Sequence, residues 1–203
     1  MRKKIPFLSL AGEKQAYLNI VYILFSFPLS ILFFCLLVTG LGLSLGFLFL
    51  FVGFIIFVGS LIMVRGFRQI EILTTRVFLN HNIPSSPDLK PAKGFWNRVN
   101  VLFTSLVTWK AFVFYLFIKL PLDIIIFSVA IGFLSVTLEL LLAPILIETY
   151  WFHNEIIIDF LIDLVEDPYV LPFLGIIWMF VSLHVINGLS WIYRWVNTGF
   201  LRS

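Results

Sequence analysis

Residues 17–64 decide the fold; they read YLNIVYILFSFPLSILFFCLLVTGLGLSLGFLFLFVGFIIFVGSLIMV and contain no Asp, Glu, Lys or Arg. A helix needs about 20 apolar residues to cross the hydrocarbon core of a membrane. This stretch is long enough for two such spans, and Thr39-Gly40-Leu41-Gly42 is the expected turn between them. The sequence therefore predicts a transmembrane helical hairpin.

Two further apolar stretches predict two more spans. One begins at Ala111 and stays apolar to Ile147, and the other runs from about Leu171 to Ile192. Over the whole chain 61% of the residues are hydrophobic and 12% are charged, against about 45–50% and about 25% in soluble domains. We therefore expect an all-α integral membrane protein of the cell membrane, with four transmembrane helices and additional amphipathic interfacial helices. The lipid bilayer is its expected partner, and nucleic acid is not.

The distribution of charge predicts the orientation. All fourteen Lys and Arg residues lie in the N-terminal tail, between the second and third spans, at the start of the third span, or in the C-terminal tail. Residues 120–193 contain none, yet they carry eight of the eleven Asp and Glu residues. Because loops rich in Lys and Arg stay in the cytoplasm, both termini and the middle loop are expected inside the cell.

These features divide one membrane domain, residues 1–203, into five segments. They are a cytoplasmic tail (1–16), a first helical hairpin (17–64), a cytoplasmic linker with amphipathic helices (65–110), a second hairpin (111–192) whose acidic extracytoplasmic insertion covers about 134–168, and a second cytoplasmic tail (193–203). Two alternatives are open for residues 133–150: they re-enter the membrane, or they form an outer cap.

The two hairpins resemble each other in sequence. Tyr22 and Pro28 are matched by Tyr115 and Pro121, at an offset of 93 residues. Later positions match at an offset of 122 residues: Gly53 with Gly175, Ser60 with Ser182, and Gly66 with Gly188. The second hairpin thus carries 29 extra residues between its helices. We expect two parallel copies related by a pseudo-twofold axis along the membrane normal.

Small residues predict where the helices pack closely, because they let two backbones approach each other in lipid. Three pairs carry this pattern: Gly42 with Gly46, Gly53 with Ser60, and Gly175 with Ser182.

Two segments of the linker have one apolar side at helical spacing. Residues 65–81 continue the second span, and their apolar side is formed by Phe67, Ile70, Leu73, Val77 and Phe78. Residues 95–110 carry Trp96, Val99, Leu102, Phe103 and Leu106 on one side. We expect the second segment to lie on the inner leaflet, and both to be surfaces that a cytoplasmic partner could bind.

The outer insertion contains Glu155, Asp159 and Asp163 at a spacing of four residues. One interpretation is a site for a divalent cation or a cationic ligand. The other is the solvated face of an interfacial helix. The second is favoured, because hard cations need oxygen ligands that converge on one point, whereas a helix presents these carboxylates in a line.

Ionisable residues within or near the spans are further candidates, since such residues are rare in membranes without a function. Glu139 and His184 are candidate ligand or sensing residues, or a buried hydrogen-bonded pair. Lys119 and Asp123 are one helical turn apart and are expected to neutralise each other. No catalytic motif and no cluster with metal-ligand spacing is found, so neither an enzyme nor a cofactor is expected.

Five short motifs occur together in this chain: Phe27-Pro28-Leu29, Thr39–Gly46 (TGLGLSLG), Phe51-Val52-Gly53, Arg65–Leu73 (RGFRQIEIL) leading to Ile83-Pro84, and Leu120-Pro121-Leu122. Over roughly residues 17–195 they resemble the prokaryotic "putative sensor" domain family. The resemblance implies a four-helix membrane unit that often precedes histidine-kinase modules or stands alone. It implies no catalytic residues, and we expect the stand-alone form.

Two classes of function follow. The first is a non-enzymatic, membrane-embedded sensory input module that acts through a separate cytoplasmic kinase or transcription regulator, and that could form a homo-oligomer. The alternative is a small transporter, channel or lipid-handling protein that uses Glu139 and His184 along its path. Few polar residues are available for such a path, which favours the first class.

Overall fold

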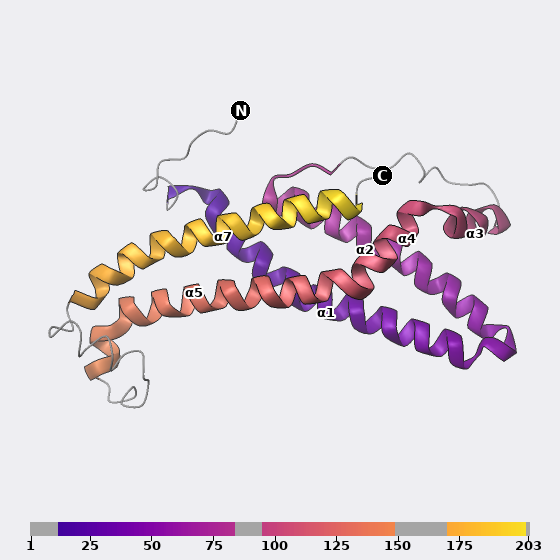
Figure 1. The fold of residues 1–203 in the computed structure, drawn as a ribbon, viewed down its shortest axis with the longest axis horizontal. Helices are drawn as coiled ribbons and strands as arrows, with labels where there is room; N and C mark the ends of the chain where they lie inside the picture. Colours follow the sequence, from indigo (N-terminus) through magenta and orange to yellow (C-terminus); the bar gives the residue numbers. More distant parts are fainter. Residues whose placement is uncertain (1–11, 84–94, 149–169, 202–203) are drawn as a thin grey trace. The chain divides into compact units, whose positions relative to one another are not determined.

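The computed structural model describes residues 12–83, 95–148 and 170–201, and every element in these ranges is a helix. In chain order they are α1 (Lys14–Gly46), the 3₁₀ turn η2 (Leu48–Leu50), α2 (Val52–Leu79), α3 (Phe95–Thr104), α4 (Leu106–Val113), the π-helical turn η4 (Phe114–Ile118), α5 (Lys119–Glu148) and α7 (Leu171–Leu201). Four stretches are long and apolar enough to cross a membrane: Lys14–Gly46, Val52–Leu79, Leu106–Ile145 and Leu171–Leu201. The expected all-helical architecture with four such helices is confirmed (Figure 1).

The helices form two compact units. The larger unit comprises residues 18–127 and 189–203, which include nearly all of α1, the whole of α2 to η4, the start of α5 and the end of α7. The smaller unit comprises residues 1–17 and 128–188, which include the rest of α5 and α7.

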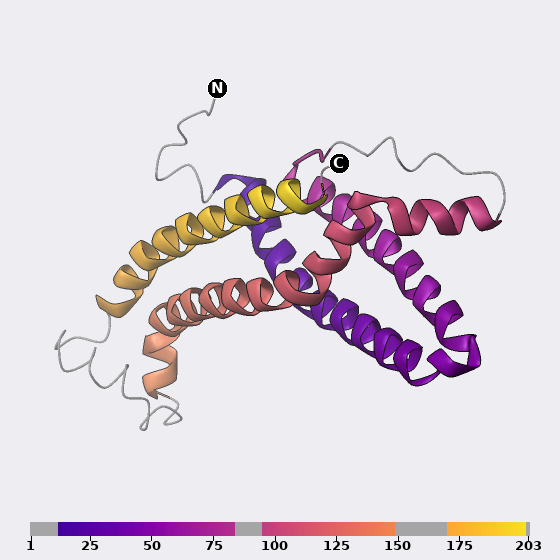
Figure 2. The same ribbon diagram turned by 45° about the vertical axis from the view of Figure 1, so that its right-hand side comes forward.

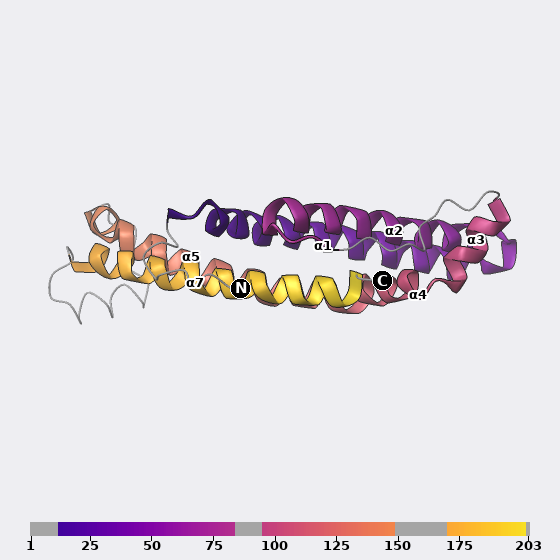
Figure 3. The same cartoon turned by 90° about the horizontal axis from the view of Figure 1, so that it is seen from above.

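In the larger unit, α1 and α2 form a helical hairpin and lie in one layer (Figures 2 and 3). α1 continues through residues 39–42, so the turn expected there is wrong. The chain reverses at residues 47–51 instead, where Phe51 adopts a left-handed conformation with φ of 55°. Gly40 stays helical because α2 packs on it: a Cβ atom there would collide with the Ser60 hydroxyl. The glycine allows close packing and does not end the helix.

Of the other glycines near the turn between α1 and α2, some lie at close contacts and others do not. No atom lies within 4 Å of a Cβ built on Gly42 or Gly46, so this pair does not mark a packing surface. On Gly53, by contrast, a Cβ would lie 2.6 Å from the backbone at Phe47 and Leu48. Gly53 therefore permits the tight turn between α1 and α2.

The core of the larger unit is aromatic. The rings of Phe33 and Phe67 stack with centroids 4.0 Å apart, and Tyr115 packs edge-on against Phe33 at 5.5 Å. In contrast, large apolar side chains cover the outside, such as Phe49 at 94% and Ile55 at 69% exposure. An apolar exterior of this kind is stable in lipid, which does not penalise apolar surface as water does.

The second half of α2 has the predicted apolar side, and most of that side faces outward. Of the predicted apolar side, Ile70, Leu73 and Val77 point outward and are exposed, and only Phe67 joins the core. The buried side of this half of α2 is polar, with Arg68, Glu71 and Thr75 at most 2% exposed. The physical reason is that a helix in lipid turns its apolar side outward and its polar side toward other helices. This half of α2 belongs to the candidate span Val52–Leu79.

α3 packs along the first half of α2. The ring of Phe103 stacks on that of Phe54 at 6.1 Å, and the Arg65 guanidinium donates to the Val101 carbonyl at 3.2 Å. Val99 and Leu102 are buried in the same core as Phe33 and Phe67, whereas Leu106 is 74% exposed. Part of the apolar side of α3 is therefore covered by α2, and its place on the inner leaflet stays a prediction.

α4 joins α5 through the π-helical turn η4 at Phe114–Ile118. Pro121 follows three residues later. Because proline has no N–H and its ring displaces the carbonyl four residues earlier, a π-type turn at this point relieves the helix. α5 then continues without a break to Glu148, so residues 133–148 extend the helix; residues 149–168 lie outside the described ranges.

The smaller unit is held by a second close approach, between α5 and α7. A Cβ built on Gly175 would lie 3.0 Å from the Leu141 nitrogen and 3.1 Å from the Leu140 carbonyl carbon. About two helical turns further along α7, the Ser182 hydroxyl lies 2.9 Å from the Thr137 hydroxyl and 3.1 Å from the Phe133 carbonyl oxygen. The predicted Gly175–Ser182 spacing thus lies on the contact between the two helices.

The two close approaches occur at matching positions. Gly53 meets the peptide bond between Phe47 and Leu48, whereas Gly175 meets the one between Leu140 and Leu141. The two glycines are 122 residues apart, and the two peptide bonds are 93 residues apart, which are the offsets of the predicted repeat. These contacts support the duplication, which stays a prediction.

Replacing Gly175 with Leu is expected to destabilise the protein, because the side chain would be forced into the backbone of α5. Overpacking of this kind costs typically about 1–3 kcal/mol. Thermal unfolding in detergent micelles, followed by far-UV circular dichroism, measures the effect. Gly42→Leu is the matched control, since a Cβ at Gly42 has no neighbour within 4 Å. Equal loss of stability in both variants would contradict the close approach.

Candidate functional site

An ion pair within α5 is the starting point of the site. The Lys119 Nζ lies 3.3 Å from the Asp123 Oδ2, one helical turn away, as the sequence predicts. Both side chains are buried, at 1% and 0% exposure. In this environment water does not compensate the two charges, so each depends on protein partners.

α2 contributes a second carboxylate to the same lysine. The Lys119 Nζ lies 2.9 Å from the Glu71 Oε1, and Glu71 is 1% exposed. The ammonium group also donates to the Ser26 hydroxyl of α1 at 2.8 Å, and this hydroxyl donates in turn to the Asp123 Oδ2 at 3.0 Å. The three N–H bonds of Lys119 thus face three helices: its own, α2 and α1.

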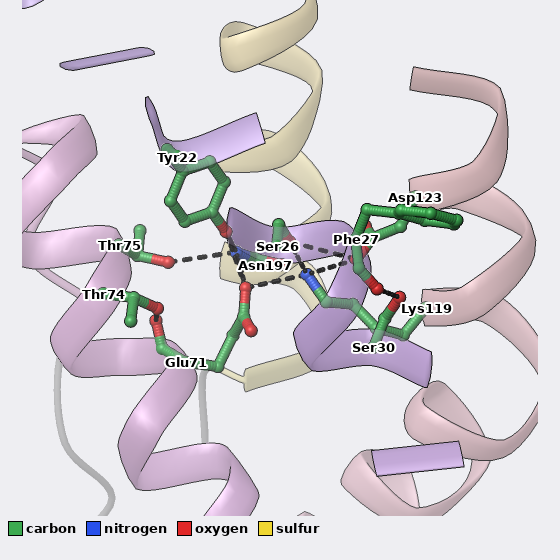
Figure 4. Close-up of polar contacts among 10 residues, drawn as sticks. All are labelled: Tyr22, Ser26, Phe27, Ser30, Glu71, Thr74, Thr75, Lys119, Asp123 and Asn197. Atoms are coloured by element: carbon green, nitrogen blue, oxygen red, sulfur yellow. Dashed lines mark hydrogen bonds and ion pairs between the residues drawn. The ribbon is translucent and has the colours of Figure 1, made fainter. Parts of the chain in front are cut away.

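The Glu71 carboxylate is held from two further helices. Its Oε1 accepts a 2.6 Å hydrogen bond from the Tyr22 hydroxyl of α1. The Asn197 Nδ2 of α7 lies 3.0 Å from the same oxygen, and also 3.0 Å from the Tyr22 hydroxyl and the Thr75 hydroxyl. Figure 4 shows these side chains converging from the four helices.

Aromatic contacts close one side of the site. The Lys119 Nζ lies 5.0 Å from the centroid of the Tyr193 ring of α7, within the range of a cation–π interaction. Tyr193 also packs edge-on against Tyr22, with centroids 5.1 Å apart. We call the group of Tyr22, Ser26, Glu71, Thr75, Lys119, Asp123, Tyr193 and Asn197 the ionic cluster. All of it lies in the larger unit.

The ionic cluster is a junction of α1, α2, α5 and α7. Charged hydrogen bonds away from water are stronger than neutral ones, and their loss is costly because it leaves a buried charge unpaired. A shift of any one helix relative to the others would therefore break at least one such contact. Chemically, the cluster can hold the helices in register and can bind or release a small cation such as a proton.

Two more contacts join α2 and the segment after it to the end of α7. The Arg68 Nε and Nη2 both donate to the Leu201 carbonyl, at 3.2 and 2.7 Å. This carbonyl belongs to the last residue of α7, which has no partner within its own helix. Beyond α2, the His81 Nε2 lies 2.9 Å from the Thr198 hydroxyl. The ends of α2 and α7 are therefore coupled.

The candidates from the sequence have different outcomes. The pairing of Lys119 with Asp123 is confirmed. Glu139 is half-buried on α5 and His184 is half-buried on α7, and the His184 Nδ1 lies 2.9 Å from the Phe180 carbonyl oxygen. Their role as ligand or sensing residues stays a prediction. Glu155, Asp159 and Asp163 lie outside the described residues.

Most residues of the ionic cluster were not predicted, although the spacing of polar residues in the sequence points to them. In each helix the buried polar residues recur at three- or four-residue spacing in otherwise apolar sequence. These lines are Asn19, Tyr22, Ser26 and Ser30 in α1; Arg68, Glu71 and Thr75 in α2; Tyr115, Lys119 and Asp123 in η4 and α5; and Ser190, Tyr193 and Asn197 in α7. One polar line on each of four spans indicates a shared polar interior.

Lys119→Met is expected to destabilise the protein by about 3–5 kcal/mol, because removal of one partner leaves two buried carboxylates without their cation. The free energy of unfolding in detergent, measured by denaturant titration, tests this. Lys110→Met is the matched control, since Lys110 is exposed on α4. Combining Lys119→Met with Glu71→Gln should recover part of the loss; no recovery would mean that the two charges are not coupled.

Comparison with known proteins gives one match. Residues 22–201 match the sequence profile of the family described as "Putative sensor". No curated protein and no solved structure is significantly similar to the chain. The match includes every residue of the ionic cluster and all four candidate spans for most of their length. Since it covers far more than half of the sequence, the protein belongs to the "Putative sensor" domain family.

Proposed function

We propose that the protein is a non-enzymatic, membrane-embedded input module of a signalling system, which acts through a separate cytoplasmic partner. Membership of the "Putative sensor" family supports this reading. The observation that carries it is the ionic cluster, because a signal needs an element that links the movement of one helix to the others. Glu71, Lys119 and Asn197 make this link between α2, α5 and α7.

The proposed orientation places both termini and the linker after α2 in the cytoplasm, because these regions carry the Lys and Arg residues. The ionic cluster then lies in the cytoplasmic half of the bilayer. Glu71 is 19 residues from the first residue of α2, Val52, and this corresponds to about 28 Å at 1.5 Å per residue. A change at the cluster is therefore close to the ends of α2 and α7 that face the cytoplasm.

The proposed mechanism is a displacement of α2 relative to α7. The cluster and the Arg68–Leu201 contact hold the two helices together in the present arrangement. A stimulus that rearranges the hydrogen bonds of Glu71 would allow the helix ends to shift, and the partner would bind the shifted ends. Arg76 on α2 and Trp195 on α7 are exposed there and can be reached by such a partner.

The partner proposed is a cytoplasmic kinase or transcription regulator. Affinity purification of the tagged full-length protein from native membranes, with the bound proteins identified by mass spectrometry, tests this. We expect one such protein to co-purify, and less of it with the variant Arg76→Glu/Trp195→Ala. Gly42→Leu, which changes a position in α1 outside the proposed contact, is the control and should keep the partner.

The alternative of a transporter, channel or lipid-handling protein makes the opposite prediction for the same preparation. If no cytoplasmic protein co-purifies, and the purified protein reconstituted in liposomes carries a solute or lipid across the membrane, the signalling proposal is wrong.

The orientation is tested by single cysteines in a background in which the native Cys35, which is exposed, is replaced by Ala. Leu50→Cys lies in the turn between α1 and α2, and Asn80→Cys lies just after α2. A membrane-impermeant maleimide is expected to label Leu50→Cys in intact cells, and Asn80→Cys only after the cells are permeabilised. The reverse pattern would overturn the assigned orientation.

A further inference from the structure

The ionic cluster has more negative than positive charge. Glu71 and Asp123 are both at most 1% exposed, and one ammonium group, that of Lys119, lies between them. The neighbouring Arg68 directs both of its described hydrogen bonds to the Leu201 carbonyl. With both carboxylates ionised, the three charged side chains carry a net charge of −1. Arg68 is also buried, and the neutral Leu201 carbonyl does not cancel its positive charge, but no described ion pair joins it to Glu71 or Asp123. Two buried carboxylates therefore share one paired cation, which is an unfavourable arrangement away from water.

The cluster also has more hydrogen-bond acceptors than donors to fill them. The three N–H bonds of Lys119 are directed to Ser26, Glu71 and Asp123. Four buried oxygen atoms of the ionic cluster have no hydrogen-bond partner in the described structure: the Glu71 Oε2, the Asp123 Oδ1, the Asn197 Oδ1 and the Tyr193 hydroxyl. Rotating the Asn197 amide would not help, because its oxygen would then face the Glu71 carboxylate. Three of these atoms are acceptors and the Tyr193 hydroxyl can donate only one hydrogen bond, so acceptors without a proton still outnumber donors in the cluster.

We propose that the cluster binds one proton and that Asp123 is the residue that accepts it, so that the module responds to pH. This inference rests on the proposed function, because it names the stimulus of the same cluster. It uses no other reactant: the proton comes from water and forms an O–H bond with the Asp123 carboxylate. The net charge of the three side chains then becomes zero.

The geometry distinguishes the two carboxylates. The Glu71 Oε1 is held by three donors at 2.6, 2.9 and 3.0 Å, from Tyr22, Lys119 and Asn197. The Asp123 Oδ2 has the Ser26 hydroxyl at 3.0 Å and Lys119 at the longer distance of 3.3 Å. Since more and shorter hydrogen bonds stabilise the ionised form of a carboxyl group, the geometry favours Asp123 as the proton acceptor.

The groups that face Asp123 come from every helix of the cluster. They are Ser26 of α1, Glu71 of α2, Lys119 of its own helix and Tyr193 of α7. Glu71 adds a negative charge that favours the protonated form, and Lys119 adds a positive charge that opposes it. The Tyr193 hydroxyl approaches Asp123 without a hydrogen bond of good geometry. It is neutral and leaves the charge balance unchanged.

Protonation would change what holds the helices. A neutral Asp123 attracts Lys119 less strongly, so the ammonium group is left with Glu71 as its only ionised partner. The contacts between α5 and α2 are then strengthened relative to those between Lys119 and Asp123 within α5. The Ser26 hydroxyl of α1, which bridges the two residues, must also reorient. Uptake of one proton is thus coupled to the helix contacts of the proposed signalling movement.

Infrared difference spectroscopy of the full-length protein in lipid vesicles, recorded as the pH is lowered at constant salt, tests the site. We expect the C=O band of a protonated buried carboxyl group to grow in the wild type and to be lost in Asp123→Asn. In Asp123→Glu the band should persist at a shifted frequency, which separates loss of the acceptor in Asp123→Asn from loss of the fold. His81→Gln changes a histidine that contacts α7 outside the ionic cluster, at Thr198, and is a control that should keep the band.

Each other result contradicts the proposal. A band that survives in Asp123→Asn but is lost in Glu71→Gln would make Glu71 the acceptor. Absence of the band in the folded wild type over the whole pH range would show that no proton binds. A spectral change that follows Na⁺ concentration at fixed pH would mean that the cluster binds a metal cation.

A second measurement separates this inference from the proposed function. Spin labels are attached at Arg76→Cys and Trp195→Cys in the Cys35→Ala background. The distance between them, measured by pulsed electron paramagnetic resonance spectroscopy, reports the separation of α2 and α7. We expect this distance to depend on pH, and to become independent of pH in Asp123→Asn. If it is independent of pH in the wild type while the partner still co-purifies, the proton inference fails and the signalling proposal stands. If the distance depends on pH but no cytoplasmic protein co-purifies, the proposal of a separate signalling partner fails and the proton inference stands.

Discussion

Lys119 is the group on which the buried polar side chains of the larger unit depend. Its ammonium contacts Glu71, Asp123 and Ser26, and through Glu71 it is joined to Tyr22 and Asn197. In a soluble protein the same side chain would reach water and lose little. In the interior of a membrane helix bundle it has only these partners. The positions of α1, α2 and α7 around α5 therefore follow from where a buried cation can be satisfied.

The same constraint explains why the buried charged side chains gather at one junction while the exterior of the helices is apolar. Hydrophobic burial contributes little to helix association in lipid, so association depends on close packing and on polar contacts. Both are present at separate places: glycines at the contact of α5 with α7, and hydrogen-bonded side chains at the cluster. The second half of α2 is an example. Ile70 and Leu73 face outward, whereas Glu71, which lies between them in the sequence, is buried.

The outward-facing apolar side chains of α2 also determine which features of the structure could be predicted from the sequence. The four spans follow from hydropathy, and the Lys119–Asp123 pair follows from helical spacing, so both were found. The turn was misplaced because glycine ends helices in water, whereas Gly40 is used here for packing against Ser60. The Glu71 contact was missed because it joins residues far apart in the chain, and because residues 65–81 were assigned to the cytoplasmic linker, where a buried carboxylate is not expected. The polar lines on the four helices would have corrected that reading.

The ionic cluster also bears on the predicted duplication. Lys119 bonds to Ser26, 93 residues away, and Asn197 bonds to Thr75, 122 residues away, and these are the two offsets of the repeat. Two equivalent residues can contact each other directly only where they lie near the axis that relates the copies. If the hairpins are copies, the cluster forms around that axis, and the charges at Lys119 and Asp123 replace the hydroxyls of Ser26 and Ser30 in the other copy. The proposed proton uptake would then follow from this difference in charge between the two copies.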